Sequence, residues 1–147
     1  MSKKHVEVYI DPKVELISII PLLAPWSNVS TRIKEYPYLR GVYNYFGKWK
    51  NHEAVQFFTK LMYSGFSIDA LLGLPTHLSD PPELKIRVEF SDYIIEKARG
   101  KERVEIFVRK LRKFCRDTYF VEFYSKHEDF YDKVAKTLRS RLKLRPL

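Results

Sequence analysis

The sequence predicts a mainly α-helical fold, a multi-helix single domain with one or two short β-strands. Apolar residues recur three, four and seven positions apart along most of the chain, and Ser, Asp or Asn, the usual N-cap residues, precede several of these stretches. A length of 147 residues with 45% hydrophobic residues suits one globular domain. We therefore expect a single domain over residues 1–147, with flexible ends at 1–5 and 143–147.

The first half of the chain predicts one strand followed by helices. Residues 6–10 alternate apolar and polar side chains, which indicates a short strand. Asp11 and Pro12 then begin a helix over 13–23, which is apolar nearly all round and so should lie at the centre of the core, with Pro21 kinking or ending it. Further helices are predicted at 38–49 with an aromatic inner face, at 52–63 behind an Asn51 cap, and at 67–78, interrupted by Gly73 and Pro75.

The second half begins with a possible second strand. Residues 84–90 alternate apolar and polar side chains between a Pro-rich turn and the cap Ser91-Asp92, which begins a short helix through Ala98. The clearest helix spans 101–116, with one apolar stripe: Val104, Phe107, Val108, Leu111, Phe114 and Cys115. Two more helices are predicted, an aromatic one beginning at Asp117-Thr118 that contains Tyr119, Phe120, Phe123 and Tyr124, and one over 128–142.

Charge and composition limit the class of protein. The net charge is +9, with +2 in residues 1–80 and +7 in residues 81–147, which fits either a solvated Lys/Arg-rich surface or a face for an acidic partner. Scarce amides and many charged residues favour a thermophilic source. No apolar run approaches the roughly 20 residues that cross a bilayer, and the N-terminus does not resemble a signal peptide, so we expect a cytoplasmic protein without membrane contact.

No complete catalytic or metal-binding motif is present, so we expect no catalytic residue, no metal ligand and no cofactor. His52-Glu53 and His127-Glu128 each begin like His-Glu-x-x-His, but neither has a second histidine four residues on to share one zinc ion. Both histidines are interpreted as helix-start residues. The lone Cys115 excludes an intrachain disulfide and is interpreted as a buried, inert thiol.

Two groups of residues remain as candidate sites. Glu15, Asp69 and His77 lie in apolar surroundings and predict either a polar pocket or ordinary structural roles, with an ion pair or hydrogen bond at Glu15 and an N-cap at Asp69. The outer side of the helix over 101–116 predicts an anion-binding face for nucleic acid or an acidic protein, because five cations gather there: Arg109, Lys110, Arg112, Lys113 and Arg116. The nearby aromatic residues fall at core spacing, so we expect them to be packed rather than exposed.

Several strings of residues carry a resemblance to a known family. They are the stretches beginning at Asp11 (DPKVELIS), Tyr45 (YFGK), His52 (HEAV), Gly65 (GFSIDA), His77 (HL), Phe114 (FCRDT) and His127 (HEDFY). In this order they resemble the N-terminal region of a family of uncharacterised zinc-metallopeptidase-like proteins of bacteria and archaea, a domain of unknown function. The resemblance spans roughly residues 8–142. Fuller members of the family continue into a segment that bears His-Glu-x-x-His, which this sequence lacks.

The resemblance implies a non-catalytic helical domain that docks a catalytic protein partner or associates with itself as a homodimer. None of the family's zinc ligands can be carried over, because no position of this chain matches them. The alternative is a basic binding module for nucleic acid or an acidic protein surface; nucleic acid is not the favoured partner.

Overall fold

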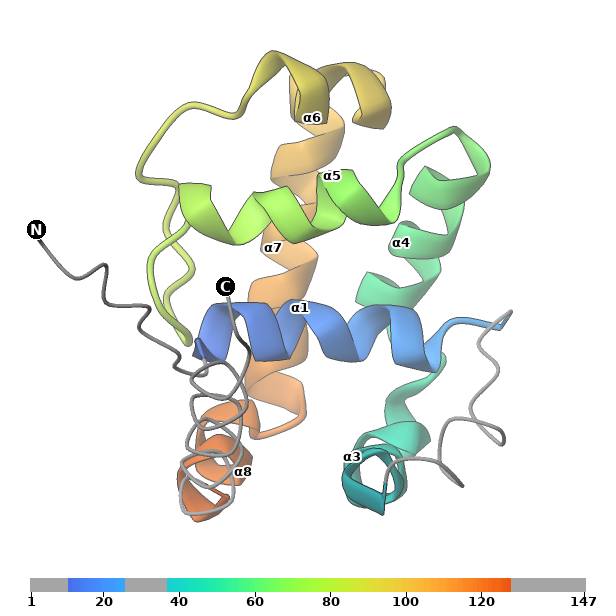
Figure 1. Cartoon of the computed structure of the whole chain (residues 1–147), viewed down its shortest axis with the longest axis vertical. Coiled ribbons are helices and arrows are strands. Elements are labelled where there is room, and N and C mark those ends of the chain that lie inside the picture. Colours follow the sequence, from blue (N-terminus) through green and yellow to red (C-terminus); the bar gives the residue numbers. More distant parts are fainter. Residues whose placement is uncertain (1–10, 26–36, 128–147) are drawn as a thin grey trace, which may run out of the picture.

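The computed structural model describes residues 11–25 and 37–127, which form a helical body around one apolar core (Figure 1). The expected mainly α fold is confirmed. The elements in chain order are α1 (Pro12–Leu23), α3 (Pro37–Phe46), the 3-10 turn η1 (Gly47–Trp49), α4 (Glu53–Tyr63), α5 (Ile68–Gly73), the 3-10 turn η2 (Leu74–His77), α6 (Asp92–Ala98), α7 (Lys101–Asp117) and α8 (Phe120–Lys126). No helix in these two ranges is long and apolar enough to cross a membrane.

Helix α1 lies at the centre, as its all-round apolar sequence predicts. It packs against α3, α4, α5 and η2, and Figure 1 shows it crossing in front of α7. The Asp11 carboxylate caps it by accepting the Lys13 N–H at 2.8 Å, and the helix ends two residues after Pro21. Its buried side chains are Leu16, Ile17, Ile19, Ile20, Leu22 and Leu23.

Helix α7 is the longest described helix and lies against α4, α6 and α8. Every member of its predicted apolar stripe is buried. The core around it is aromatic, and the expectation that the aromatic residues are packed holds for eight described phenylalanines: Phe46, Phe58, Phe66, Phe90, Phe107, Phe114, Phe120 and Phe123. Phe46 lies 6.2 Å from Phe114 between ring centroids and so joins α3 to α7.

The predicted strand over residues 84–90 is wrong. Only an isolated antiparallel bridge between Ile86 and Leu78 forms there, because this segment finds no full-length partner strand among the described residues. Alternation reports which side chains can face a core, but a strand also needs a neighbour for its backbone groups. The predicted strand over residues 6–10, the helix over 128–142 and the flexible ends lie outside the described residues.

Three local predictions are corrected. His52, rather than Asn51, caps α4, because its Nδ1 accepts the Ala54 N–H at 3.0 Å. Ser67, rather than Asp69, caps α5 through its hydroxyl, which accepts the Ala70 N–H at 3.1 Å. Tyr119 is exposed rather than packed, because the chain turns left-handed there and separates α7 from α8.

Candidate functional site

The structure does not bring Glu15, Asp69 and His77, the predicted polar pocket, together around one cavity. Glu15 is half-buried in the first turn of α1, and Asp69 is exposed in the first turn of α5. His77, at the end of η2, stands edge-on to Phe90 at 5.6 Å, and its buried Nδ1 finds no hydrogen-bond partner in the described part of the chain. Helix α1 contacts both α5 and η2, so the elements meet, but these three side chains line neither cavity described below.

The predicted anion-binding face of α7 is partly taken up by internal contacts. Lys110 and Lys113 form ion pairs with Glu53 at 3.5 and 2.8 Å, and Arg112 donates from Nε to the carbonyls of Glu83 and Leu84 at 3.1 Å each. The two remaining cations of the set, Arg109 and Arg116, are exposed, and neither has an ion pair with another described residue. The face therefore presents fewer available charges than its sequence suggests.

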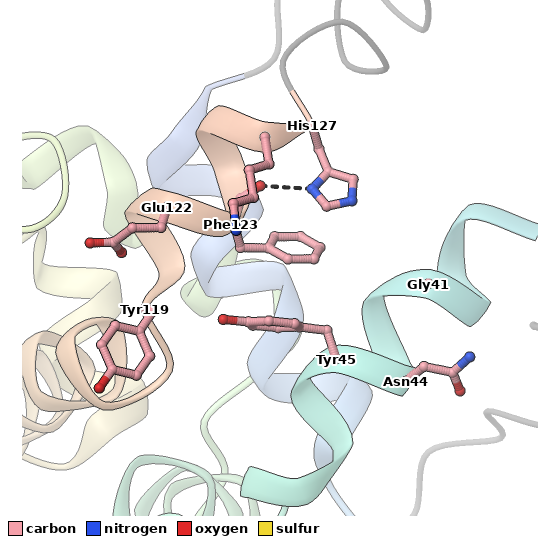
Figure 2. Close-up of a pocket in the computed structure, with 8 residues that line it drawn as sticks. Gly41, Asn44, Tyr45, Tyr119, Glu122, Phe123 and His127 are labelled. Carbon is pink, nitrogen blue, oxygen red and sulfur yellow. Dashed lines mark hydrogen bonds between the residues drawn. The ribbon is translucent and has the colours of Figure 1, made fainter.

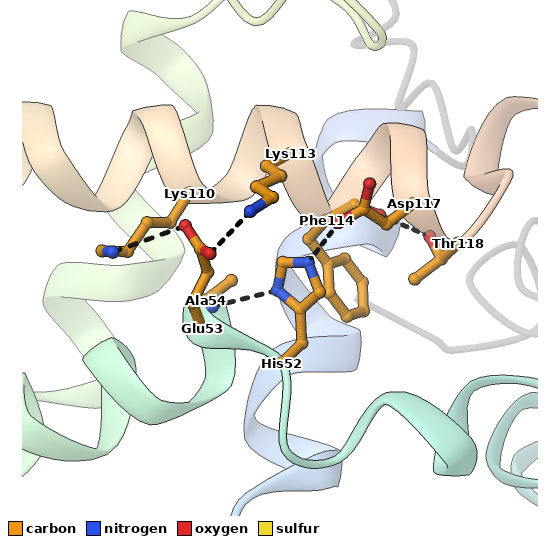
Figure 3. Close-up of polar contacts among 8 residues, drawn as sticks. All are labelled: His52, Glu53, Ala54, Lys110, Lys113, Phe114, Asp117 and Thr118. Carbon is orange, nitrogen blue, oxygen red and sulfur yellow. Dashed lines mark hydrogen bonds and ion pairs between the residues drawn. The ribbon is translucent and has the colours of Figure 1, made fainter.

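The contacts of Glu53 belong to a closed polar junction between α4 and α7 (Figure 3). The ring of His52 is fixed at both nitrogens: Nδ1 accepts from Ala54, so Nε2 carries the proton and donates to Asp117 at 2.9 Å. The same ring stands edge-on to Phe114 at 5.2 Å. The hydrogen bond from Lys113 holds the pKa of the Glu53 carboxyl below its ordinary value. Because each polar group here already has a partner, the α4–α7 junction is structural.

An open cleft lies between α3 and α8, and it is the candidate functional site (Figure 2). Its volume is about 670 Å³, within the range of sites that bind small molecules or peptide side chains. Tyr45 and Phe123 form its aromatic floor, with ring centroids 4.6 Å apart. The remaining lining residues are Gly41 and Asn44 from α3, Tyr119 before α8, and Glu122, Lys126 and His127 from α8 and its end.

Two hydrogen bonds to backbone carbonyls fix the orientation of the rings in this cleft. The Tyr45 hydroxyl donates to the Thr118 carbonyl at 2.7 Å, and burial, with Glu122 and Tyr119 nearby, raises the pKa of that hydroxyl. His127 stacks on Phe123 at 4.2 Å and donates from Nδ1 to the Phe123 carbonyl at 2.7 Å. Neutral His127 therefore keeps a lone pair on Nε2, which bonds to no described residue and can accept a hydrogen bond from a ligand.

Tyr119 stands at the edge of the cleft in an unusual conformation. Its φ and ψ are 55° and 42°, a left-handed geometry that is unfavourable for an aromatic residue, and its side chain is 62% exposed. An exposed ring held in a strained backbone beside a cleft is a feature that binding sites retain. Tyr119 therefore marks the cleft as the better candidate of the two regions.

Neither the cleft nor the rest of the described chain has the donor set of a metal centre. No group of three or more His, Cys, Asp or Glu side chains among these residues could hold an ion. Cys115 is buried as predicted, and burial, aided by Glu122, raises the pKa of its thiol to about 11. Such a thiol is protonated at neutral pH and is a poor nucleophile.

The family described as a domain of unknown function (DUF4932) matches residues 6–145. The chain belongs to this family. Membership of a family of unknown function is thus confirmed, whereas kinship of this DUF4932 chain with metallopeptidases stays a prediction. No curated protein and no solved structure matches the chain.

The sequence did not reveal the cleft of this DUF4932 domain. Tyr119 was expected to be packed rather than exposed, and His127 was interpreted as a helix-start residue rather than the C-cap of α8. Asn44 lies far in the sequence from Glu122 and Lys126, and the three residues form no motif. One local signal was present: polar residues at 117–118 interrupt the helical pattern, and a break between helices commonly opens a surface depression.

Proposed function

We propose that this chain is a non-catalytic binding domain that docks a protein partner through the α3–α8 cleft. One observation carries the proposal: a cleft of about 670 Å³ joins an aromatic floor to polar groups supplied by two helices. Protein-binding sites of this kind take an apolar anchor side chain into a pocket, with polar groups around it setting orientation.

The occupant that fits is an extended peptide segment with an aromatic anchor. Tyr45 and Tyr119 offer ring surface for stacking, and aromatic pairs contribute about 0.5–1.5 kcal/mol beyond burial. The Asn44 side chain has the donor and acceptor of an amide, so it pairs well with a peptide backbone. Glu122 and Lys126 are four residues apart on α8 and carry opposite charges, which distinguishes the two ends of a bound segment.

The proposal also names the kind of protein that docks at the cleft. The sequence strings described above support kinship with the N-terminal part of a prokaryotic metallopeptidase-like protein, and we propose that a catalytic protein of this kind supplies the docking segment in the cytoplasm. Self-association is the other form that docking could take. Stoichiometric zinc in the purified chain together with peptide cleavage would overturn the non-catalytic part of the proposal.

The alternative, a basic module for nucleic acid or an acidic protein, rests on the net charge of +9 and on the exposed Arg109 and Arg116. The internal ion pairs of Lys110 and Lys113 count against it, because those charges already have a counter-ion in Glu53. Titration with nucleic acid at two salt concentrations separates the two functions. Useful affinity near physiological salt with a steep salt dependence would favour the alternative.

The test uses the whole chain labelled with ¹⁵N and a set of blocked hexapeptides that differ only in a central Trp, Phe, Leu or Ser. We expect the Trp and Phe peptides to shift amide signals of α3 and α8, with dissociation constants on the order of 1 mM or tighter. Replacing Tyr119→Ala should weaken binding about tenfold, the loss of roughly 1.4 kcal/mol of stacking and contact.

The matched control is Tyr63→Ala, which removes another exposed tyrosine at the far end of α4. It should leave peptide binding unchanged. The proposal fails if no peptide shifts the cleft signals, or if the two variants weaken binding equally.

A further inference from the structure

One acceptor at the α3–α8 cleft is in direct contact with its aromatic floor. The His127 ring stacks on Phe123 with the ring centroids 4.2 Å apart, and its Nδ1 lies 2.7 Å from the Phe123 carbonyl. A carbonyl oxygen can only accept, so the proton of the neutral ring is on Nδ1 and the lone pair is on Nε2. Since Nε2 bonds to no described residue, it is available to a donor on a bound ligand.

The other polar groups of the cleft are placed differently. Figure 2 shows the carboxylate of Glu122 on the Tyr119 side of the cleft, away from the rings of His127 and Phe123. The Tyr45 hydroxyl is occupied as a donor, because it donates to the Thr118 carbonyl at 2.7 Å. A ring that packs against the aromatic floor therefore meets His127 as its acceptor.

Gly41 leaves the α3 wall of the cleft open. It lies inside α3, where glycine destabilises a helix relative to alanine. Its φ is not in the left-handed region, and no described atom lies within 4 Å of the place where a Cβ would stand. Neither the backbone nor the packing of the described residues thus requires a glycine here. Its missing side chain leaves room in the cleft for the ring of a bound residue.

We propose that the anchor side chain bound by the cleft is tryptophan, and that its indole N–H donates to His127 Nε2 while the ring packs against the aromatic floor beside Gly41. Phenylalanine fills the same space but leaves Nε2 without a donor. A site that hydrogen-bonds one group of a ligand discriminates against an analogue that lacks this group. The inference rests on the proposed docking function and specifies the chemistry of the docking segment.

Another cavity, of about 350 Å³, borders residues 86–90 and serves as an internal comparison. Its polar lining consists of four charged side chains: Arg87, Glu89, Lys101 and Glu105. Phe90 is the aromatic residue of this lining, so the cavity lacks a neutral acceptor beside a pair of aromatic rings. We expect the indole to bind at the α3–α8 cleft and not at this cavity.

Three blocked hexapeptides that differ only in the central residue test the role of the indole N–H. They carry tryptophan, 1-methyltryptophan or phenylalanine, and they are titrated into the full ¹⁵N-labelled chain. The tryptophan peptide should bind roughly three- to tenfold tighter than the other two, the effect of one hydrogen bond. Its amide shifts should map to α3 and α8, and shifts confined to residues 86–90 would contradict the assignment to the cleft.

The variant His127→Phe separates this hydrogen bond from a general loss of structure. It keeps a ring that can stack on Phe123 but removes the acceptor, so the preference for tryptophan over 1-methyltryptophan should disappear. A purely structural role of His127 would weaken both peptides equally and leave their ratio unchanged, which would overturn the assignment. The matched control, Glu122→Ala, removes another acceptor of the cleft and should keep the ratio.

The variant Gly41→Leu tests the open wall of the cleft. It should raise the thermal midpoint of unfolding, because leucine is the better helix former, and it should weaken the tryptophan peptide at least tenfold by filling the cleft. The control, Arg40→Leu, places the same side chain at the neighbouring exposed position of α3, outside the cleft, and should leave binding unchanged. Equal effects of the two variants on binding would show that Gly41 does not admit the anchor.

The failure of this inference is distinguishable from that of the proposed function. Equal binding of all three peptides at α3 and α8 would reject the indole hydrogen bond and leave docking at the cleft intact. If no peptide shifts the signals of α3 and α8, both proposals are wrong.

Discussion

The α4–α7 junction and the α3–α8 cleft are built from similar parts and reach opposite outcomes. Each places a histidine against a phenylalanine: His52 stands edge-on to Phe114, and His127 lies stacked on Phe123 (Figures 2 and 3). At the junction both ring nitrogens are bonded, whereas at the cleft only Nδ1 is bonded within the described chain. Residue type alone therefore does not separate a structural histidine from a candidate binding residue.

The difference teaches that the number of satisfied polar groups distinguishes the two regions. A polar group with all its partners contributes to the stability of the fold, while one that retains bonding capacity at a cavity is available to a ligand. Substitutions in the junction should therefore change the free energy of unfolding, and substitutions in the cleft should change binding with smaller effects on stability.

The largest expected effect is at Phe114. Its side chain is fully buried and contacts both Phe46 and His52, so Phe114→Ala should lower the free energy of unfolding by about 3–5 kcal/mol. Chemical denaturation of the variant and wild type measures the difference. A loss below about 1 kcal/mol would mean that the junction is not the packed region described here.

The two histidines give a direct comparison. His52→Ala removes the cap of α4 and the bond to Asp117, and should lower the free energy of unfolding by about 1–2 kcal/mol. His127→Ala removes one bond at the end of α8 and should cost about 0.5–1 kcal/mol, with a larger effect on peptide binding. Thermal unfolding of both variants measures the two losses of stability. Equal losses would contradict the difference between the α4–α7 junction and the α3–α8 cleft.

Substitutions of Tyr119 test the backbone strain at the edge of the cleft. Glycine adopts the left-handed conformation without penalty, so Tyr119→Gly should be more stable than Tyr119→Ala by about 1 kcal/mol. Both variants lack the ring, so both should lose peptide binding to the same extent. If the alanine variant proves as stable as the glycine variant, the backbone at this position is not held left-handed in solution.

The smallest expected effect is the pH dependence at Glu53. Its pKa is lowered from the ordinary 4.5 in the folded state, chiefly by the hydrogen bond from Lys113, so the carboxylate stabilises the fold above that pH. This contribution is lost as the pH falls through the lowered pKa. The stability difference between wild type and Glu53→Gln should therefore be present at pH 7 and shrink below about pH 4, and added salt should reduce it because the pair is exposed. A difference that is independent of pH would exclude the ion pairs as its cause.

The local patterns predicted the helices well and their ends less well. The apolar stripe of α7 was predicted completely, and the interruption of the 67–78 helix at Gly73 and Pro75 appears as the change from α5 to η2. The caps were missed by one or two positions, at His52 and Ser67, because several neighbouring side chains can accept the same backbone N–H. The strand over 84–90 was wrong, since alternation cannot supply a partner strand.

The candidate sites show more clearly what the sequence could not predict. The five cations of α7 were visible in the sequence. That three of them bind Glu53 or the carbonyls of residues 83 and 84 was not visible, because those acceptors lie tens of residues away. The α3–α8 cleft had no motif at all, since its lining residues come from two distant segments.

By itself, the sequence determined that this protein is a mainly helical domain with a central α1, an amphipathic α7 and a buried Cys115. These properties follow from periodicity and apolar content, which act over a few residues. The tertiary structure alone decided which histidine is fully bonded, which cations remain available and where a cleft opens. Such properties depend on contacts between residues far apart in the chain, and helical periodicity carries no information about them.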